Sequence, residues 1–492
     1  MDKVTIGFAP TRRNLFSAEA AIEYANLTRQ KMDELAIDYV DILDINEDGL
    51  LYDDEGVEKI AILDINEDGL LYDDEGVEKI AEKFKAAKID GLFLANENFG
   101  TEYACARLAK KLDVPVLLWG PKDETPAADG SRLRDTQCGL FAIGKVLRRF
   151  KVPFTYVKNS DIDSPEFARG LQDFIKVCNV VKTFKQTRIL QVGPRPFDFW
   201  TVICNEGELL ERFNISLSPV PIQEVVQEIK KVKEQQPDKV QAVIDYFETN
   251  TEVQISAKDL EMVAALKVAL QNLCESYGCN AGVIQCWTAL QDEIGILPYA
   301  SLSLLQEEGL PFVCETDVHG AISELLVEAA SLGEHRAIFA DVNCRHPENE
   351  NGELLQHLGV FAYSTAETKP ILPQRHFVFD YPGSVAFRAI KDEYTLCRFD
   401  GDNGEYSLLM GTGKGIDGPY NQGTYLYLEF ANLNRLEFKL VEGPYIHHVA
   451  AVRKNVVPIL YEACKYIGVQ PDFYDPIEED VKAYLRGDQS WK

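Results

Sequence analysis

The sequence has no run of about 18 apolar residues, and no apolar stretch near its start is long enough for a signal peptide. These absences argue against a membrane-spanning chain and against secretion. The sequence also lacks any CxxC motif, and its 11 cysteines, an odd number, are scattered among apolar neighbours. That distribution indicates reduced, mostly buried thiols. We therefore expect a soluble, cytoplasmic protein.

Basic residues are in the minority. Lys and Arg number 50 against 79 Asp and Glu, which gives a formal net charge of −29 that is spread along the chain. Such a field repels phosphate backbones and anionic lipids, so neither nucleic acid nor a membrane is an expected partner. Glycine and proline are unremarkable and 46% of the residues are hydrophobic, which excludes disordered and fibrous classes. A globular chain of 492 residues should form about two or three domains.

Two stretches of the sequence alternate strand-like and helix-like segments. Residues 1–165 begin with KVTIGFAP, AEAAIEYANLTRQKMDEL and IDYVDIL, and residues 166–350 contain NAGVIQCW, LPFVCETD and RAIFADVN, each before a helix-like stretch. This alternation is typical of parallel sheets covered by helices. It predicts an α/β protein with two parallel-sheet βαβ domains.

The pattern changes after about residue 350. Period-two runs such as HFVFDYPGSVAFRAI, EYTLCRF, TYLYLEFA and RLEFKLVEG are bounded by Gly, Asn and Asp. They predict an antiparallel β-rich, barrel-like C-terminal domain over 351–492, closed by a helix within AAVRKNVVPILYEACKYI. GTGKG at Gly411–Gly415 lacks the residues of a phosphate-binding loop, and we expect a hairpin turn there.

A segment of 20 residues occurs twice without a difference, at Ile42–Ala61 and at Ile62–Ala81. One copy completes the strand, loop and helix pattern, so the second is surplus, and a perfect pair differs from the divergent units of repeat proteins. The segment also fits the EF-hand loop, with Asp44, Glu55 and their counterparts Asp64 and Glu75 at its two ends. A strand-like run before it favours an acidic strand-to-helix loop over calcium binding.

Two carboxylates follow apolar runs in the second region. Glu315 ends GLPFVCE, and Asp341 ends RAIFAD. Carboxylates at the carboxyl ends of parallel strands face the crevice where α/β sheets bind ligands, whereas either residue alone is as readily a helix cap. Their occurrence in successive units favours a shared site.

Histidine is scarce, with seven residues, yet His447 and His448 are adjacent at a point where a strand is expected to lead into a helix. Two carboxylates and one imidazole form a hard, oxygen-rich ligand set with open positions, which suits Mn²⁺ or Mg²⁺ better than structural zinc.

Four segments, CETDVHGAISELLVEAAS, FADVN, ELLQHLGVF and PYIHHVA, resemble in order and approximate spacing the metal-site segments of the L-fucose and L-arabinose isomerases. The resemblance implies a metal-dependent aldose–ketose isomerase in which Glu315, Asp341 and His448 hold one divalent cation, Mn²⁺ or else Mg²⁺ or another ion. His357 matches an additional metal-site histidine of the arabinose branch, Asp341 matches the fucose branch, and His447 is the less certain neighbour. The resemblance also implies a homo-trimer or homo-hexamer with sites at subunit interfaces.

The segments IQCWTALQDEIG, NENFGTE and PTRRN are similar to the same family. Gln285 and Trp287 are candidates to line a sugar pocket, although a buried aromatic is an equal alternative for Trp287. Arg12 and Arg13 are candidates to bind sugar hydroxyls or an anionic group, or else form a solvated loop pair.

These features predict an isomerase of a free aldose of the L-fucose, L-arabinose or D-arabinose type, acting through an enediol. Moving a carbonyl from C1 to C2 needs a base and stabilisation of the developing enediolate, and Glu315 and Asp341 beside a metal supply both. Two alternatives remain: an isomerase of a phosphorylated or sulfonated sugar, and a non-catalytic sugar-binding or regulatory protein.

Overall fold

The computed structural model describes residues 3–13, 15–43, 71 and 75–487. The chain divides into two compact units: Met1–Val181 with Glu479–Lys492, and Lys182–Glu478. Within the described residues, no helix combines the length and the apolar character that crossing a membrane requires. All 11 cysteines are free thiols and most are buried, as the sequence predicts.

The first unit contains a five-stranded parallel sheet in the order β2-β1-β3-β4-β5. Residues of one strand alternate between two apolar clusters: Phe8 and Phe93 pack on one face of the sheet, and Ala9 and Leu94 on the other. The sheet is therefore covered by helices on both faces. The elements are β1 Ile6–Thr11, α1 Ala18–Glu34, β2 Tyr39–Val40, α3 Glu75–Ala86, β3 Gly91–Asn96, α4 Glu102–Leu112, β4 Val116–Trp119, α5 Thr136–Arg149, β5 Thr155–Tyr156, most of α6 Pro165–Lys185, and most of α16 Glu478–Leu485.

The second copy of the duplicated segment supplies part of this core. Leu71 is fully buried, its N–H donates to the Pro10 carbonyl at 2.6 Å, and its carbonyl accepts from the Arg12 N–H at 3.2 Å. Val77 and Ile80 of α3 are also buried. The EF-hand positions 44–55, and 64–74 apart from Leu71, lie outside the described residues.

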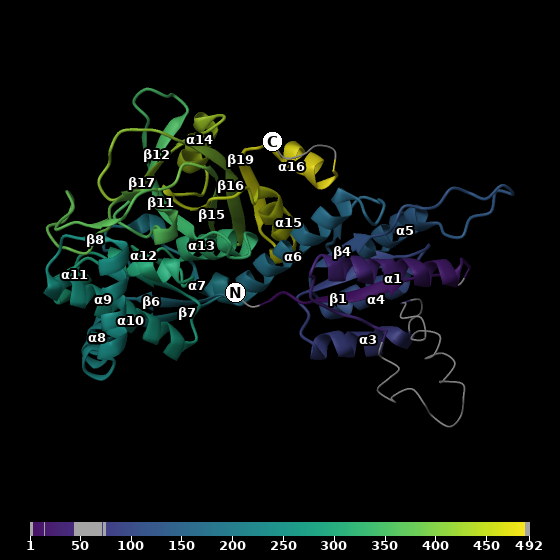
Figure 1. Cartoon of the computed structure of the whole chain (residues 1–492), viewed down its shortest axis with the longest axis horizontal. Helices are drawn as coiled ribbons and strands as arrows, with labels where there is room; N and C mark the ends of the chain where they lie inside the picture. Colours follow the sequence, from purple (N-terminus) through teal and green to yellow (C-terminus); the bar gives the residue numbers. More distant parts are fainter. Residues whose placement is uncertain (1–2, 14, 44–70, 72–74, 488–492) are drawn as a thin grey trace. The chain divides into compact units, whose positions relative to one another are not determined.

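The second unit begins with a four-stranded parallel sheet in the order β10-β9-β6-β7. In Figure 1 the helices α8, α9 and α10 lie beside this sheet. The elements are β6 Arg188–Val192, the 3₁₀ turn Trp200–Val202, α7 Glu206–Phe213, β7 Ser216–Val220, α8 Ile222–Gln235, α9 Pro237–Asn250, β8 Glu252–Val253, α10 Ala257–Tyr277, β9 Ala281–Ile284, α11 Ala289–Ile294, α12 Tyr299–Glu307, β10 Phe312–Val313 and α13 Val318–Ala330.

The same unit continues into an antiparallel barrel, in which β17, β12, β11, β18, β15 and β16 pair in sequence and the β16–β17 pairing closes the ring. Parallel sheets followed by an antiparallel barrel confirm the predicted fold class. The elements are β11 Ala337–Arg345, β12 Gly352–His357, the 3₁₀ turn Tyr363–Thr365, β13 Ile371–Leu372, β14 Phe387–Arg388, β15 Glu393–Asp402, β16 Glu405–Ile416, β17 Thr424–Glu429, α14 Leu433–Glu442, β18 His448–Val452, α15 Val457–Ile467 and β19 Gln470–Asp475.

Several local predictions around the barrel are wrong. RAIFADVN does not end a parallel strand: it forms β11, which pairs antiparallel with β12 and β18, so Asp341 lies within a strand. RLEFKLVEG forms most of α14, because Asn432 caps the helix and Leu433 and Leu436 are buried at helical spacing, whereas Phe438 of the period-two pattern is exposed.

Three more segments near the C-terminus differ from expectation. His448 begins the buried strand β18, and helix α15 follows only after this strand, so the histidine pair leads into a strand rather than a helix. Most of HFVFDYPGSVAFRAI is irregular, with β14 as its one strand. GTGKG lies inside β16: a Cβ at Gly411 would come within 2.5 Å of the Asp475 carbonyl oxygen, so close packing and not a turn requires this glycine.

Candidate active site

Glu315 lies two residues after the end of β10, at the carboxyl end of the parallel sheet. Glu315 and Thr316 both have left-handed backbone conformations, with φ of 59° and 58°. Such conformations are strained for residues with a Cβ and are typical of functional sites. The Glu315 N–H contacts the Cys286 Sγ at 3.3 Å, and the Trp287 Nε1–H donates to Oε1 at 3.1 Å. These contacts fix the direction of the carboxylate.

Asp341 and His448 come from the barrel. They are paired residues of the adjacent antiparallel strands β11 and β18. Directly opposite residues of such a pair point to the same face with their Cβ atoms about 5 Å apart. The register therefore brings together two side chains that are far apart in the sequence.

The structure brings the three predicted metal ligands together around the Nε2 atom of His448. The His448 Nε2 lies 3.0 Å from the Glu315 Oε2 and 3.4 Å from the Asp341 Oδ1. His448 is fully buried, and both its Nε2 and the Asp341 Oδ1 are buried without a hydrogen bond of acceptable geometry. Buried polar atoms are ordinarily hydrogen-bonded, so this pair of atoms requires an explanation.

Glu315 and His448 shift each other's pKa. Burial raises the pKa of Glu315, but the close contact with His448 and the charge of that imidazole outweigh this effect and lower the pKa to about 2. Burial lowers the pKa of His448, but its bonds to Asp317 and Glu315 raise it to about 10. The Nε2 of His448 is thus held among carboxylates that favour a positive charge at this point.

A divalent cation fits these donors. Two carboxylate oxygens and one imidazole nitrogen face one another, and two of these atoms lack hydrogen-bond partners. A hard, oxygen-rich set of this kind suits Mn²⁺ or Mg²⁺. Glu315, Asp341 and His448 would hold the ion.

His357 has a different position from the three ligands. Its Nε2 lies 3.1 Å from the Cys314 Sγ, and these two residues and Glu315 place potential ligand atoms within 4.8 Å of one another. However, its Nδ1 accepts the Leu358 N–H at 2.9 Å. A neutral imidazole that accepts at Nδ1 carries its proton on Nε2, so in this arrangement His357 is a donor rather than a ligand.

A buried network lies behind His448. The His448 Nδ1 is 2.9 Å from the Asp317 Oδ2. Arg398 binds both oxygens of Asp317, and its Nε–H donates to the Asp400 Oδ2 at 2.9 Å. The Asp400 Oδ1 is 3.0 Å from the His319 Nδ1. Asp317, Arg398, Asp400 and His319 are not predicted as site residues from the sequence, although an arginine inside the apolar run TLCRF is a usable signal for a buried charge pair.

The loop after β6 lies against the same histidines. The Phe199 ring is centred 5.9 Å from the His447 ring and 5.6 Å from the His448 ring. The Thr316 hydroxyl contacts the Pro194 carbonyl at 3.4 Å. In this loop the Arg195 guanidinium donates to the carbonyls of Pro196 and Phe197.

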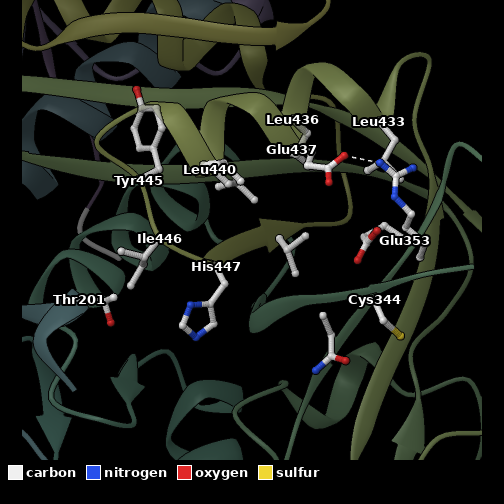
Figure 2. A pocket seen from close by; sticks show the side chains of 14 residues that line it. Thr201, Cys344, Glu353, Leu433, Leu436, Glu437, Leu440, Tyr445, Ile446 and His447 are labelled. Atoms are coloured by element: carbon white, nitrogen blue, oxygen red, sulfur yellow. Dashed lines mark hydrogen bonds and ion pairs between the residues drawn. The ribbon is translucent and has the colours of Figure 1, made fainter. Parts of the chain in front are cut away.

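His447 connects this centre to a pocket of about 470 Å³. Its Nε2 is 4.0 Å from the Asp341 Oδ1, and burial together with His448 lowers its pKa. Figure 2 shows His447 and Thr201 on one side of the pocket and Glu353 on the other, while α14 contributes apolar side chains. Arg345 is paired with Glu437, and burial raises the pKa of Glu353 to about 7. With two carboxyl groups for one arginine, the lining suits a ligand rich in hydroxyl groups better than an anion.

The remaining predicted residues divide between the two units of the chain. Gln285 follows β9, and its N–H donates to the Val192 carbonyl at 2.9 Å. Trp287 contacts the carboxylate of Glu315 as described above. Arg12 and Arg13 belong to the first unit: the Arg13 Nε–H donates to the Gly100 carbonyl at 3.0 Å, and its guanidinium lies over the Phe99 ring and 3.6 Å from Glu102. The charge of Arg13 therefore already has a partner.

The chain is similar to known sugar isomerases. Residues 7–185 match the model of the fucose/sulfoquinovose isomerase N-terminal domain. A sulfoquinovose isomerase of Priestia aryabhattai is 24% identical over 405 residues, which covers 80% of this chain and 87% of that protein. Another, of Alkalicoccus urumqiensis, is 24% identical over 363 residues, 72% of this chain and 79% of that protein.

A solved periplasmic solute-binding protein of Actinobacillus succinogenes 130z with bound D-allose aligns over 58% of this chain and 77% of its own, but at 11% identity and a TM-score of 0.16. This likeness carries no argument about fold or function. The family model and the sulfoquinovose isomerases confirm that the chain resembles the fucose isomerase-like proteins, as the sequence predicts.

Proposed function

We propose that the protein is a metal-dependent aldose–ketose isomerase that acts on a sulfonated sugar. The convergence of Glu315, Asp341 and His448 on one point carries the proposal, because it combines a cation site with carboxylates that can move protons. Aldose–ketose isomerisation agrees with the family and with the relatives. A sulfonated substrate agrees with the names of those relatives, and the free-aldose expectation gains no support from them.

A sulfonate needs a positive or strongly donating partner. Arg195 is a candidate in the unit that contains Glu315, because it follows β6 at the same edge of the sheet as Glu315 and hydrogen-bonds to backbone carbonyls of its own loop. The carboxyl groups of the pocket in Figure 2 leave it less suited to the anionic end of the sugar. We therefore propose that Arg195 faces the sulfonate and that the pocket beside His447 takes hydroxyl groups.

The chemistry requires a proton to leave C2 of the open-chain aldose and a proton to arrive at C1, while the hydroxyl proton moves from O2 to O1. A divalent cation held by Glu315, Asp341 and His448, which we propose is Mn²⁺, would supply positive charge that stabilises the developing enediolate. The Glu315 Oε1 accepts the Trp287 Nε1–H, whereas the Asp341 Oδ1 has no hydrogen bond. We propose Asp341 as the acceptor of the carbon-bound proton and Glu315 as the more firmly held ligand.

The enediol route has an isotopic signature. A proton held by a carboxylate can exchange with water before it returns to carbon, so turnover in D₂O should place deuterium at C1 of the ketose. Ketose free of deuterium after repeated turnover, as a hydride shift would give, contradicts the enediol assignment.

The substrate class can be tested directly. The full chain loaded with Mn²⁺ should convert 6-deoxy-6-sulfoglucose to its ketose with a kcat/KM at least about tenfold above those of glucose, L-fucose and L-arabinose, since a charge-assisted contact contributes about 1.5–3 kcal/mol. Chelation should abolish the activity. Higher kcat/KM on any neutral aldose would return the protein to the free-aldose class, and sugar binding without turnover would indicate a binding protein.

We also propose a homo-oligomer of three or six subunits, as the resemblance implies. The loop that contacts the histidines leaves two large aromatic side chains in solvent, Phe197 at 93% and Trp200 at 71% exposure. Exposed apolar groups beside a site are typical of surfaces that a partner covers.

A further inference from the structure

The histidine that faces the carboxylates is oriented by a second carboxylate on its other side. Arg398 binds Asp317 through both oxygens, which is the two-oxygen pairing of a guanidinium with an ionised carboxylate. An ionised carboxylate only accepts hydrogen bonds. The His448 Nδ1, 2.9 Å from the Asp317 Oδ2, therefore carries a hydrogen and donates it.

With Nδ1 protonated, a neutral His448 has its lone pair on Nε2, the atom that faces Glu315 and Asp341. We propose that Asp317, held by Arg398, selects this tautomer and thereby sets the affinity of the site for its divalent cation. This inference rests on the metal site of the proposed function. Asp317 is a positioning residue, because it touches the ring and not the cation or the sugar.

The surroundings of Asp317 leave its carboxylate little freedom. Its Oδ1 accepts the Gly320 N–H at 2.9 Å, which caps α13, and an Arg398 Nη2–H at 3.1 Å. Its Oδ2 accepts from the Arg398 Nη1 and from His448. Asp317, Arg398 and His448 are each at most 1% exposed, so water does not compete for these bonds. Four donors around two oxygens leave no room for the carboxylate to turn.

Asp317→Asn is the most informative variant because the contacts around this side chain determine the orientation of the introduced amide. Its oxygen should take the Oδ1 position, where two N–H groups need an acceptor. Its NH₂ group then faces the His448 Nδ1 and makes that nitrogen an acceptor, so the ring proton moves to Nε2 and blocks the metal position.

Asp400→Asn is the matched control. It removes one negative charge from the same buried network, because Asp400 accepts from the Arg398 Nε, the Gly401 N–H and His319. It has no contact with His448 in the described structure. If charge alone mattered, both variants would weaken cation binding equally.

The measurement is the Mn²⁺ dissociation constant of the full chain by competition with a fluorescent chelator, with no sugar present. Asp317→Asn should weaken binding about 10–100-fold, the usual effect of losing an outer partner of a metal-bound histidine, whereas Asp400→Asn should change it by less than about threefold. Wild-type affinity in Asp317→Asn, or equal losses in both variants, would overturn the proposal.

Two further readouts separate positioning from folding and from the proposed reaction. In the Mg²⁺-loaded wild type, nitrogen NMR of labelled histidines should show His448 protonated at Nδ1, and the opposite tautomer would overturn the inference even if Asp317→Asn does not fold. A wild type that binds Mn²⁺ with this tautomer but isomerises no aldose would refute the proposed function and leave the inference standing.

Discussion

The parallel sheets and the barrel position their candidate site residues differently relative to the strands. In the parallel sheets these residues follow the strands: Glu315 comes after β10, Trp287 after β9 and Arg195 after β6. In the barrel they lie inside or at the ends of strands, as Asp341 does in β11 and His448 in β18. A loop after a parallel strand opens into a crevice wherever the strand ends. A residue within an antiparallel strand reaches a site only if the register is right.

The largest test of this comparison replaces one carboxylate from each region. Glu315→Gln and Asp341→Asn should each lower kcat by at least about 10³-fold, because each removes a charge facing the cation and a group able to move protons. If Asp341 is the base, Asp341→Asn should also abolish exchange of the C2 proton with D₂O, measured by NMR. Substantial exchange in Asp341→Asn, with none in Glu315→Gln, would assign proton transfer to the parallel-sheet carboxylate instead.

The difference between the regions also explains what could be predicted from the sequence. The alternation of strands and helices around the parallel sheets is predictable from the sequence. The position of Glu315 is also predictable, because the apolar run GLPFVCE indicates the end of a strand. Asp341 is wrongly predicted to end a parallel strand, because RAIFAD has the composition of such a strand while its antiparallel partners β12 and β18 come later in the chain. Asp317 and Arg398 are not predictable as a pair from the sequence, because only the register of the folded strands brings their charges together.

The second test compares two histidines of the barrel. His448→Ala should weaken Mn²⁺ binding at least about 10-fold, whereas His357→Gln should leave it within about threefold, because the Leu358 N–H occupies the Nδ1 of His357 and leaves a hydrogen on Nε2. Metal content after gel filtration and the chelator assay measure both. Loss of the cation from His357→Gln would instead make this histidine a ligand, as in the arabinose branch.

The third test asks which unit recognises the anionic group. Arg195→Gln should raise KM for the sulfonated aldose about 10-fold or more and leave kcat and the kinetics on neutral aldoses unchanged, since a charge-assisted bond contributes about 1.5–3 kcal/mol. Arg13→Gln is the control, because the guanidinium of Arg13 already contacts Gly100 and Glu102. If Arg13→Gln carries the selective loss, the sulfonate site belongs to the N-terminal unit and the loop after β6 does not provide it.

The fourth test adds one methyl group to a strand of the barrel. Gly411→Ala in β16 should destabilise the barrel, because it places a Cβ 2.4 Å from the Tyr474 ring and 2.5 Å from the Asp475 carbonyl oxygen. Overpacking of this kind costs about 1–3 kcal/mol, so the melting temperature should fall by several degrees.

Deleting 20 residues between β2 and α3 should have less effect than that methyl group. Because the two copies are identical, removing either one gives the same sequence, and the buried positions of Leu71, Val77 and Ile80 are filled by the same residue types. The connection becomes shorter, and the lower entropy of closing it changes stability by no more than about 1 kcal/mol in the stabilising direction. Thermal unfolding and kcat/KM should therefore match the parent protein within about 2 °C and about twofold. Insolubility or a large drop in melting temperature would mean that both copies are packed, and that a parallel-sheet connection can be as constrained as a barrel strand.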